Sequence, residues 1–319
     1  MPRSSIQPGS RPAPRGAFTP CKAWAQPSLS KSGAWFLPMT LVHLMRATRK
    51  PTAAVRTAEL GLDLSALTAA RRNPEQVEEA VRSALRGGVR LLDSPDAEIF
   101  PFGAPGLRLM LHAGKPLPEG AERLAPGEDV TLVLSGAAVL ADRPLWKRAQ
   151  ALRDGGACDR VGLAVEPGGD ALGLAKRFKP TVMQIACGLL DQRAVRSGAL
   201  ETIASMGIEI QLRTSLLRGL LFLPREALPA ALSEAGSQVS RARRMIAESG
   251  ADPLQAALAF ALHRPEASAV VVPAGSVGEV RALLAASTAP LPDLDWPALA
   301  LDHPAALDAE AELYRRAAA

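Results

Sequence analysis

The sequence predicts an α/β protein with a (β/α)₈ barrel, a TIM barrel, over residues 55–300, and three observations lead to this fold class. Eight short apolar segments alternate with helical patterns. Most of these segments are continuous apolar runs, which is typical of parallel strands covered on both faces. Eight such units over about 260 residues match a closed barrel in size. A doubly wound sheet is the alternative, but no GxGxxG follows the first strand, and the eightfold count favours the barrel.

The first half of the chain supplies four strands. AELGLDL gives the first strand, and a helix with Asn73 as its N-cap and Pro74 in its first turn follows, ending at Gly87-Gly88. VRLLD, LRLMLHAG and VTLVLSG give the next three strands. A helix through Trp146 then runs to Gly155-Gly156.

The second half repeats this alternation. DRVGLAV leads to a helix near 169–178, and TVMQIAC to a helix near 194–206 that stops at Gly207. IEIQLRTS precedes two helical stretches, and ASAVVVPAG precedes a last helix at 276–286. The expected strands are 57–63, 89–93, 108–113, 130–135, 160–165, 181–187, 208–214 and 268–273.

Charge is distributed unevenly along the chain. The net charge of the 319 residues is +5, but residues 1–58 contain nine Lys or Arg and no acid, so the remainder carries 28 basic and 32 acidic residues. This balance argues against a nucleic-acid surface on the folded body. No run approaches the roughly 20 apolar residues of a membrane span. The three cysteines form no disulfide framework, which fits a cytoplasmic protein.

The two ends of the chain differ from the barrel. Residues 1–38 are rich in Pro, Ser, Gly and Arg and lack periodicity, so we expect a disordered extension, with Met39 as an alternative start. Residues 301–319 are expected to form a C-terminal helical tail.

Four segments resemble the aldo-keto reductases. GGVRLLDSPDAE is similar to the segment in which a helix ends at Gly and a strand leads into Asp-Thr-Ala-x-x-Tyr-Gly. VMQIACGLLDQR resembles the sixth strand of that family, and GIEIQLRTSLLRGLLFLPREALP the seventh strand with its loop. DPLQAALAFALHRPEASAVVVPAGSVGEVRALL resembles its penultimate helix, eighth strand and phosphate-binding turn. Short bacterial reductases are the most similar members.

The resemblance implies a catalytic tetrad in which a Tyr protonates a carbonyl while NADPH delivers hydride, a Lys and an Asp tune the Tyr, and a His orients the carbonyl. Asp93 matches the Asp, but Glu98 stands at the Tyr position and the only Tyr in the chain is Tyr314. The Lys position falls on Lys115 or, in another register, on His112 or Ala113.

Ser135 or Gly136 stands where the resemblance expects the His. Each surviving residue also has an ordinary structural interpretation: Asp93 can cap a turn, His112 can be a hydrogen-bonded core residue, and Glu98 can be a solvated carboxylate.

The cofactor elements are better preserved. Gln184 matches the Gln that hydrogen-bonds the nicotinamide amide, but Ala164 and Val165 replace the Ser-Asn pair after the fifth strand. The remaining cofactor-binding candidates, taken from the seventh and eighth strands and the turns after them, are Arg213, Ser215, Gly219, Gly275, Ser276 and Arg281. Gly275 and Ser276 open the last helix and offer backbone N–H groups to a phosphate, which Arg281 could neutralise.

Two functional hypotheses remain open. The first is a barrel with the ancestry of an NADP(H)-dependent oxidoreductase that is now non-catalytic or weakly catalytic, with a weakened NADP(H) site or none, and with an unidentified protein partner. The second is a working carbonyl reductase for small aldehydes or ketones, in which Glu98 or His112 replaces the Tyr as the acid. No His or Cys spacing indicates a metal site, and no GxSxG indicates a serine hydrolase.

Overall fold

The computed structural model describes residues 57–69, 74–94, 105–113, 117, 123–125, 129–213, 221, 235–302 and 307. Within these ranges the strands are β1 Glu59–Asp63, β2 Leu91–Ser94, β3 Arg108–His112, β4 Asp129–Ser135, β5 Arg160–Val165, β6 Val182–Ala186, β7 Glu209–Arg213 and β8 Ala269–Pro273. The helices are α1 Ser65–Ala69, α2 Pro74–Arg86, α3 Gly136–Ala141, α4 Arg143–Asp154, α5 Ala171–Phe178, α6 Arg193–Arg196, α7 Ala199–Ser205, α8 Gly236–Glu248, α9 Pro253–Leu262, α10 Val277–Ser287 and the 3₁₀ helix η5 Trp296–Leu299.

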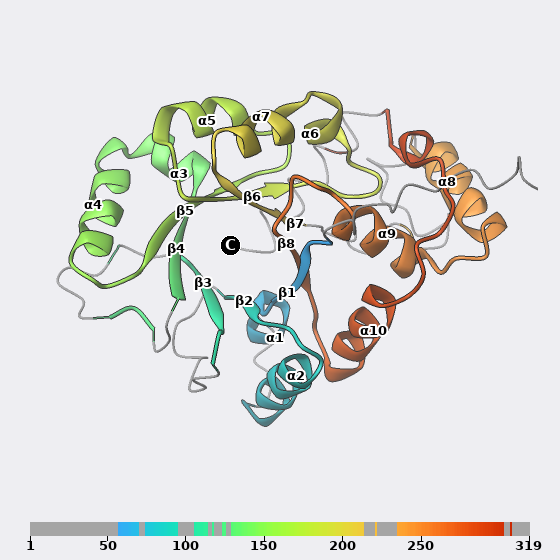
Figure 1. The fold of residues 1–319 in the computed structure, drawn as a ribbon, viewed down its shortest axis with the longest axis horizontal. Helices are drawn as coiled ribbons and strands as arrows, with labels where there is room; N and C mark the ends of the chain where they lie inside the picture. Colours follow the sequence, from blue (N-terminus) through green and yellow to red (C-terminus); the bar gives the residue numbers. More distant parts are fainter. Residues whose placement is uncertain are drawn as a thin grey trace, which may run out of the picture. The chain divides into compact units, whose positions relative to one another are not determined.

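The eight strands form a closed parallel barrel in the order β1 to β8, with β8 hydrogen-bonded to β1. Figure 1 shows the helices outside the ring of strands. The predicted (β/α)₈ fold is therefore confirmed, and the doubly wound sheet is excluded. Because all strands are parallel, their carboxyl ends lie at the same end of the barrel, which we call the mouth.

Local sequence signals set the helix ends. Asp252 caps α9 through a capping box with Gln255, and Pro253 occupies its first turn. Asp170 caps α5 by accepting a hydrogen bond from the Gly173 N–H at 2.8 Å. These caps satisfy N–H groups that have no partner inside a helix.

One predicted helix is wrong as a single element. The stretch expected near 194–206 consists of two short helices, α6 and α7. Gly198 separates them with a φ of 70°, a conformation that glycine adopts without steric cost and that interrupts a right-handed helix.

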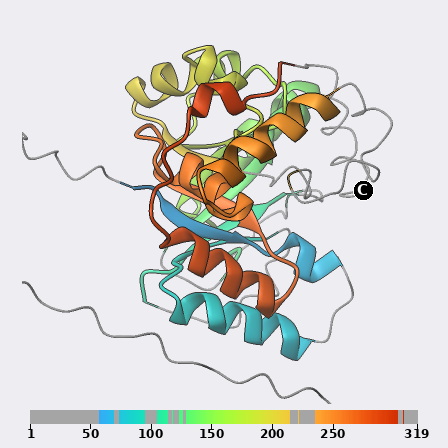
Figure 2. The same ribbon diagram turned by 90° about the vertical axis from the view of Figure 1, so that its right-hand side faces the viewer.

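Helices α2 and α10 lie side by side (Figure 2). Their close approach depends on Gly87, just after α2: a Cβ atom there would lie 2.4 Å from Cδ1 of Leu284. A side chain at position 87 would require the Leu284 side chain to move.

Strand residues alternate between two apolar layers. One cluster, inside the barrel, consists of Leu91, Met110, Val133, Ala164, Val182, Ala269 and Val271. The larger cluster lies between the strands and the helices and includes their neighbours, such as Leu92, Leu109 and Val270. The alternation is the period of two expected for β-strands, and here both faces are apolar because both are covered.

Charged side chains form ion pairs at the other end of the barrel, opposite the mouth. Glu59, Arg108, Asp129, Arg160 and Glu209 are the first residues of their strands. Arg108 pairs with Glu59 and Glu209, and Arg160 pairs with Asp129 and Glu209. Since β3 and β5 are not neighbours of β7, these contacts cross the inside of the barrel. We call the five residues the lower ion network.

Residues 1–38 lie outside the described residues, as does most of 301–319, so the extension and the tail stay predictions. No helix in the described part of the chain is long and apolar enough to cross a membrane.

The barrel interior should be sensitive to lost volume. Leu91 is fully buried, so Leu91→Ala should lower the free energy of unfolding by about 2–5 kcal/mol. Leu291→Ala, at a side chain that is 52% exposed, should change it by less than about 0.5 kcal/mol. Urea denaturation followed by circular dichroism measures both, and equal effects would contradict the assignment of Leu91 to the core.

Candidate functional site

Four charged or ionisable side chains gather at the mouth. Asp63 and His112 end β1 and β3, Arg213 ends β7, and Asp93 lies one residue before the end of β2. Asp63 and Asp93 are 3% and 1% exposed, so both carboxylates are buried and require partners. Arg213 Nη2 lies 3.3 Å from Asp63 Oδ2, and Asp63 Oδ1 also accepts the Ser65 N–H at 2.8 Å.

Asp93 is held by His112 and Gln184. His112 Nε2 lies 2.9 Å from Asp93 Oδ1, and Gln184 Nε2 donates to Oδ2 at 2.6 Å. Burial raises the pKa of the Asp93 carboxyl, but the charge and hydrogen bond of His112, the charge of Arg213 and the hydrogen bond from Gln184 outweigh it and hold that pKa below its usual value. Asp93 is therefore an anion at neutral pH and acts as a hydrogen-bond acceptor.

A hydrogen-bonded chain runs from Asp93 down the inside of the barrel. Gln184 Nε2 also donates to Gln211 Oε1 at 3.2 Å, and Gln211 Nε2 donates to Glu209 Oε1 at 3.2 Å. Glu209 belongs to the lower ion network. We call the residues His112, Asp93, Gln184, Gln211 and Glu209 the axial chain. Because a carboxylate accepts at each end, the two amides between them are held in one orientation.

His112 occupies the outer end of the axial chain. Its side chain is 22% exposed, whereas that of Asp93 is 2% exposed. The imidazole binds Asp93 through Nε2, and no described residue hydrogen-bonds to Nδ1. Of the sequence alternatives for the Lys position, His112 contacts Asp93, whereas Lys115 lies outside the described residues. Nδ1 of His112 is therefore without a described partner at the mouth.

Ser135, Ala164 and Val165 contribute to helix capping and apolar packing. The Ser135 hydroxyl caps α3 by accepting from Ala138 N at 3.5 Å. Ala164 belongs to the apolar cluster inside the barrel, and Val165 packs in the outer layer toward the helices. Neither side chain can hydrogen-bond a ligand at the mouth.

The predicted phosphate turn is filled by a side chain of the same helix. The Gly275 N–H donates to Glu279 Oε2 at 2.7 Å, and Ser276 Oγ accepts from the Glu279 N–H at 3.2 Å. Glu279 thus occupies one of the N–H groups that a phosphate would use and adds a negative charge there. Arg281 lies on the exposed side of α10.

Three of the predicted site residues besides Lys115 also lie outside the described residues. They are Glu98, Ser215 and Gly219. Their placement stays a prediction.

Sequence reasoning missed Asp63, Gln211 and Glu279. A signal existed for Gln211, because Glu209, Gln211 and Arg213 alternate as polar residues along one face of β7. No comparable pattern marks Asp63. Among the described residues no group of three or more His, Cys, Asp or Glu could hold a metal ion. The absence of a metal site stays a prediction.

Three of the residues that the resemblance assigns to NADP(H) have hydrogen bonds or ion pairs within the chain. Gln184 is completely buried, its two amide hydrogens are directed to Asp93 and Gln211, and only its oxygen lacks a described partner. Arg213 is paired with Asp63, and Gly275 with Glu279. These three groups are bonded within the chain, whereas Arg281 is exposed and Ser215 and Gly219 lie outside the described residues.

Asp93→Asn should destabilise the fold at neutral pH. The amide cannot accept from both His112 and Gln184 as the carboxylate does, so we expect a loss of about 1–3 kcal/mol in the free energy of unfolding. Because the folded pKa of Asp93 is lowered, the stabilisation is complete above the unfolded pKa of about 4 and is lost as pH falls through the folded value.

Urea denaturation from pH 7 down to pH 3 tests this dependence, and the deficit of the variant should shrink only below about pH 4. Asp154→Asn is the control, since Asp154 is 66% exposed and pairs with its neighbour Arg153. A deficit that is constant with pH would refute the role of the Asp93 charge.

Comparisons with known proteins agree on the architecture. No family model matches the chain, and no curated protein is significantly similar in sequence. Among solved structures, the holo form of an aldo-keto reductase from Bacillus halodurans is similar with a TM-score of 0.58 and 17% identity, over 73% of this chain and 88% of that chain. A glycerol dehydrogenase from Gluconobacter oxydans is similar with a TM-score of 0.55 and 12% identity, over 75% and 91%. The chain therefore has the barrel fold of the aldo-keto reductases.

Proposed function

We propose that this protein is a barrel of the aldo-keto reductase fold that has lost efficient carbonyl reduction and acts as a non-catalytic binding or partner protein. One observation carries the proposal: three of the groups that the resemblance assigns to NADP(H) are bonded to the chain's own side chains. Gln184 is bound to Asp93, Arg213 to Asp63, and Gly275 to Glu279. A cofactor would have to break these contacts before forming its own.

The missing proton donor supports the same proposal. The only tyrosine of the chain is Tyr314, near the C-terminal end of the sequence, and Glu98 stands at the position after β2 that the resemblance assigns to the acid. Losing a general acid typically costs about 10²–10⁴-fold in rate. Ala164 and Val165 add a second loss, because small errors in placing a reacting group can cost about 10²-fold.

NADPH binding and turnover test the proposal together. Fluorescence titration should show weak NADPH binding or none, and assays with a panel of aldehydes should show little or no oxidation of NADPH. Rapid turnover would overturn the proposal. Tight binding without turnover would show a retained nucleotide site on a non-catalytic barrel.

Glu279→Ala should tighten NADPH binding. The variant frees the Gly275 N–H and removes a negative charge beside the start of α10, so we expect about three- to tenfold tighter binding. Glu201→Ala, in the first turn of α7, removes the same charge elsewhere and should leave the affinity unchanged. Equal titrations for wild type and Glu279→Ala would mean that Glu279 does not obstruct the turn.

A second candidate function is a carbonyl reductase that uses His112 as the acid. The observation in its favour is the Asp93–His112 pair, which places a supported imidazole at the mouth with Nδ1 unbonded to any described residue. A protonated His112 could donate from this nitrogen to a carbonyl oxygen at the mouth.

The two sequence candidates for a recruited acid can be separated by substitution. If turnover is found, His112→Phe should lower kcat by about 10²–10⁴-fold while Glu98→Gln changes it little. The reverse result would assign the acid to Glu98. Circular dichroism spectra of both variants should match the wild type, which excludes unfolding as the cause.

A further inference from the structure

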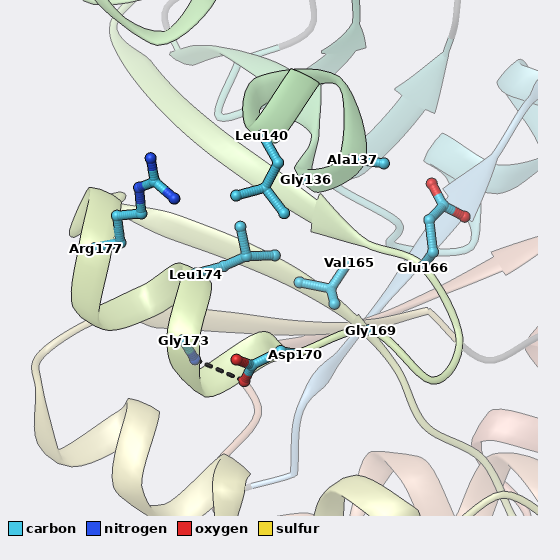
Figure 3. Close-up of a pocket in the computed structure, with 10 residues that line it drawn as sticks. All are labelled: Gly136, Ala137, Leu140, Val165, Glu166, Gly169, Asp170, Gly173, Leu174 and Arg177. Carbon is cyan, nitrogen blue, oxygen red and sulfur yellow. Dashed lines mark hydrogen bonds between the residues drawn. The ribbon is translucent and has the colours of Figure 1, made fainter. Parts of the chain in front are cut away.

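We propose that the cavity between α3 and α5 binds a small carboxylate that carries a short apolar chain. The cavity lies between α3, the end of β5 and the first two turns of α5 (Figure 3). Its volume is about 350 Å³, within the roughly 300–1,000 Å³ that small-molecule sites occupy.

Two glycines allow close packing in the walls of the cavity. A Cβ atom at Gly136, on α3, would lie 2.6 Å from Cδ1 of Leu174, and one at Gly173, on α5, would lie 2.1 Å from Oδ2 of Asp170. Asp170 is fixed in this place because it caps α5 through the Gly173 N–H. A side chain at either glycine would displace a neighbour that shapes the cavity.

Apolar side chains line the middle of the cavity. Leu140, on α3, and Leu174, on α5, point toward one another, and Val165 at the end of β5 lies beside them (Figure 3). Leu174 and Val165 are each 6% exposed, but Leu140 is 49% exposed. A large apolar side chain that stays in water beside a cavity would gain from an apolar ligand that covers it.

Arg177 gives the cavity a charged end. It follows Asp170, Gly173 and Leu174 at seven, four and three residues, so these four positions lie on one face of α5. Arg177 forms no ion pair with any described carboxylate, and its guanidinium carbon lies 5.1 Å from the centre of the Phe178 ring. A guanidinium presents paired N–H donors whose geometry matches a carboxylate.

The opposite end sets the orientation of the ligand. Glu166 lies at the far side of the cavity from Arg177 (Figure 3), and Asp170 also lines it. Both carboxylates repel an anion, so the carboxylate of the ligand belongs at Arg177 and its apolar chain extends over Leu140 and Leu174. None of Asp63, Asp93, His112 and Arg213 lines this cavity, and the inference is independent of whether the barrel reduces carbonyls.

Isothermal titration calorimetry with hexanoate tests the site, with hexanol and hexylamine as matched probes of the same chain length. Hexanoate should bind more tightly than either probe. Arg177→Gln should weaken hexanoate binding tenfold or more, because it removes a charged hydrogen-bond pair. Lys176→Gln removes the same charge from the neighbouring exposed residue and should change the affinity by less than twofold.

A second variant tests the location of the site. Ala137→Trp places a large side chain on the α3 wall of the cavity and should abolish hexanoate binding, with an unchanged circular dichroism spectrum as the check on folding. The proposal is overturned if hexanoate does not bind, if hexanol or hexylamine binds as tightly, if Lys176→Gln weakens binding as much as Arg177→Gln, or if folded Ala137→Trp still binds.

Discussion

The buried carboxylate of Asp93 is the constraint on which the inside of this barrel depends. A charge removed from water destabilises a fold unless hydrogen bonds and opposite charge compensate it. His112 and Gln184 supply the hydrogen bonds. The constraint also reaches Gln211, because Gln184 directs its amide hydrogens to both Asp93 and Gln211. The polar interior therefore follows from one aspartate.

The axial chain links both ends of the barrel. Below the two glutamines, burial raises the pKa of Glu209, but hydrogen bonds from Gln211 and Arg160 and the charges of Arg160 and Arg108 hold it below its usual value. Two anions thus bracket two amides, with the apolar cluster around Met110 and Val133 surrounding them. If some of these buried polar groups lost their hydrogen-bond partners, the core would be destabilised. We therefore expect substitutions within the axial chain to have coupled effects on stability.

The contacts that these residues make within the chain also support the proposal that the barrel is non-catalytic. A binding site presents donors and acceptors that await a ligand, but Gln184, Arg213 and Gly275 already have partners. His112 keeps one unbonded nitrogen at the mouth, and Arg177 keeps a guanidinium without a described carboxylate beside the α3–α5 cavity. These two groups lie at different places, and only His112 lies at the site that the sequence resemblance implies.

The sequence by itself determined the eight strands, most of the longer helices and the strand position of Asp93, because apolar runs and helix caps are local signals. It also suggested Gln184 through a motif. Only the tertiary structure decided that His112 contacts Asp93, that Gln211 joins Gln184 to Glu209, and that Glu279 folds back on Gly275. The contacts inside the barrel join strands far apart in the chain, and strand tilt and register set which side chains meet there. The Glu279 contact is local, but Ser276-x-x-Glu279 predicts a helix start equally well with or without a phosphate. Local sequence patterns therefore determine the strands and helices, whereas the tertiary structure determines which side chains become hydrogen-bond partners.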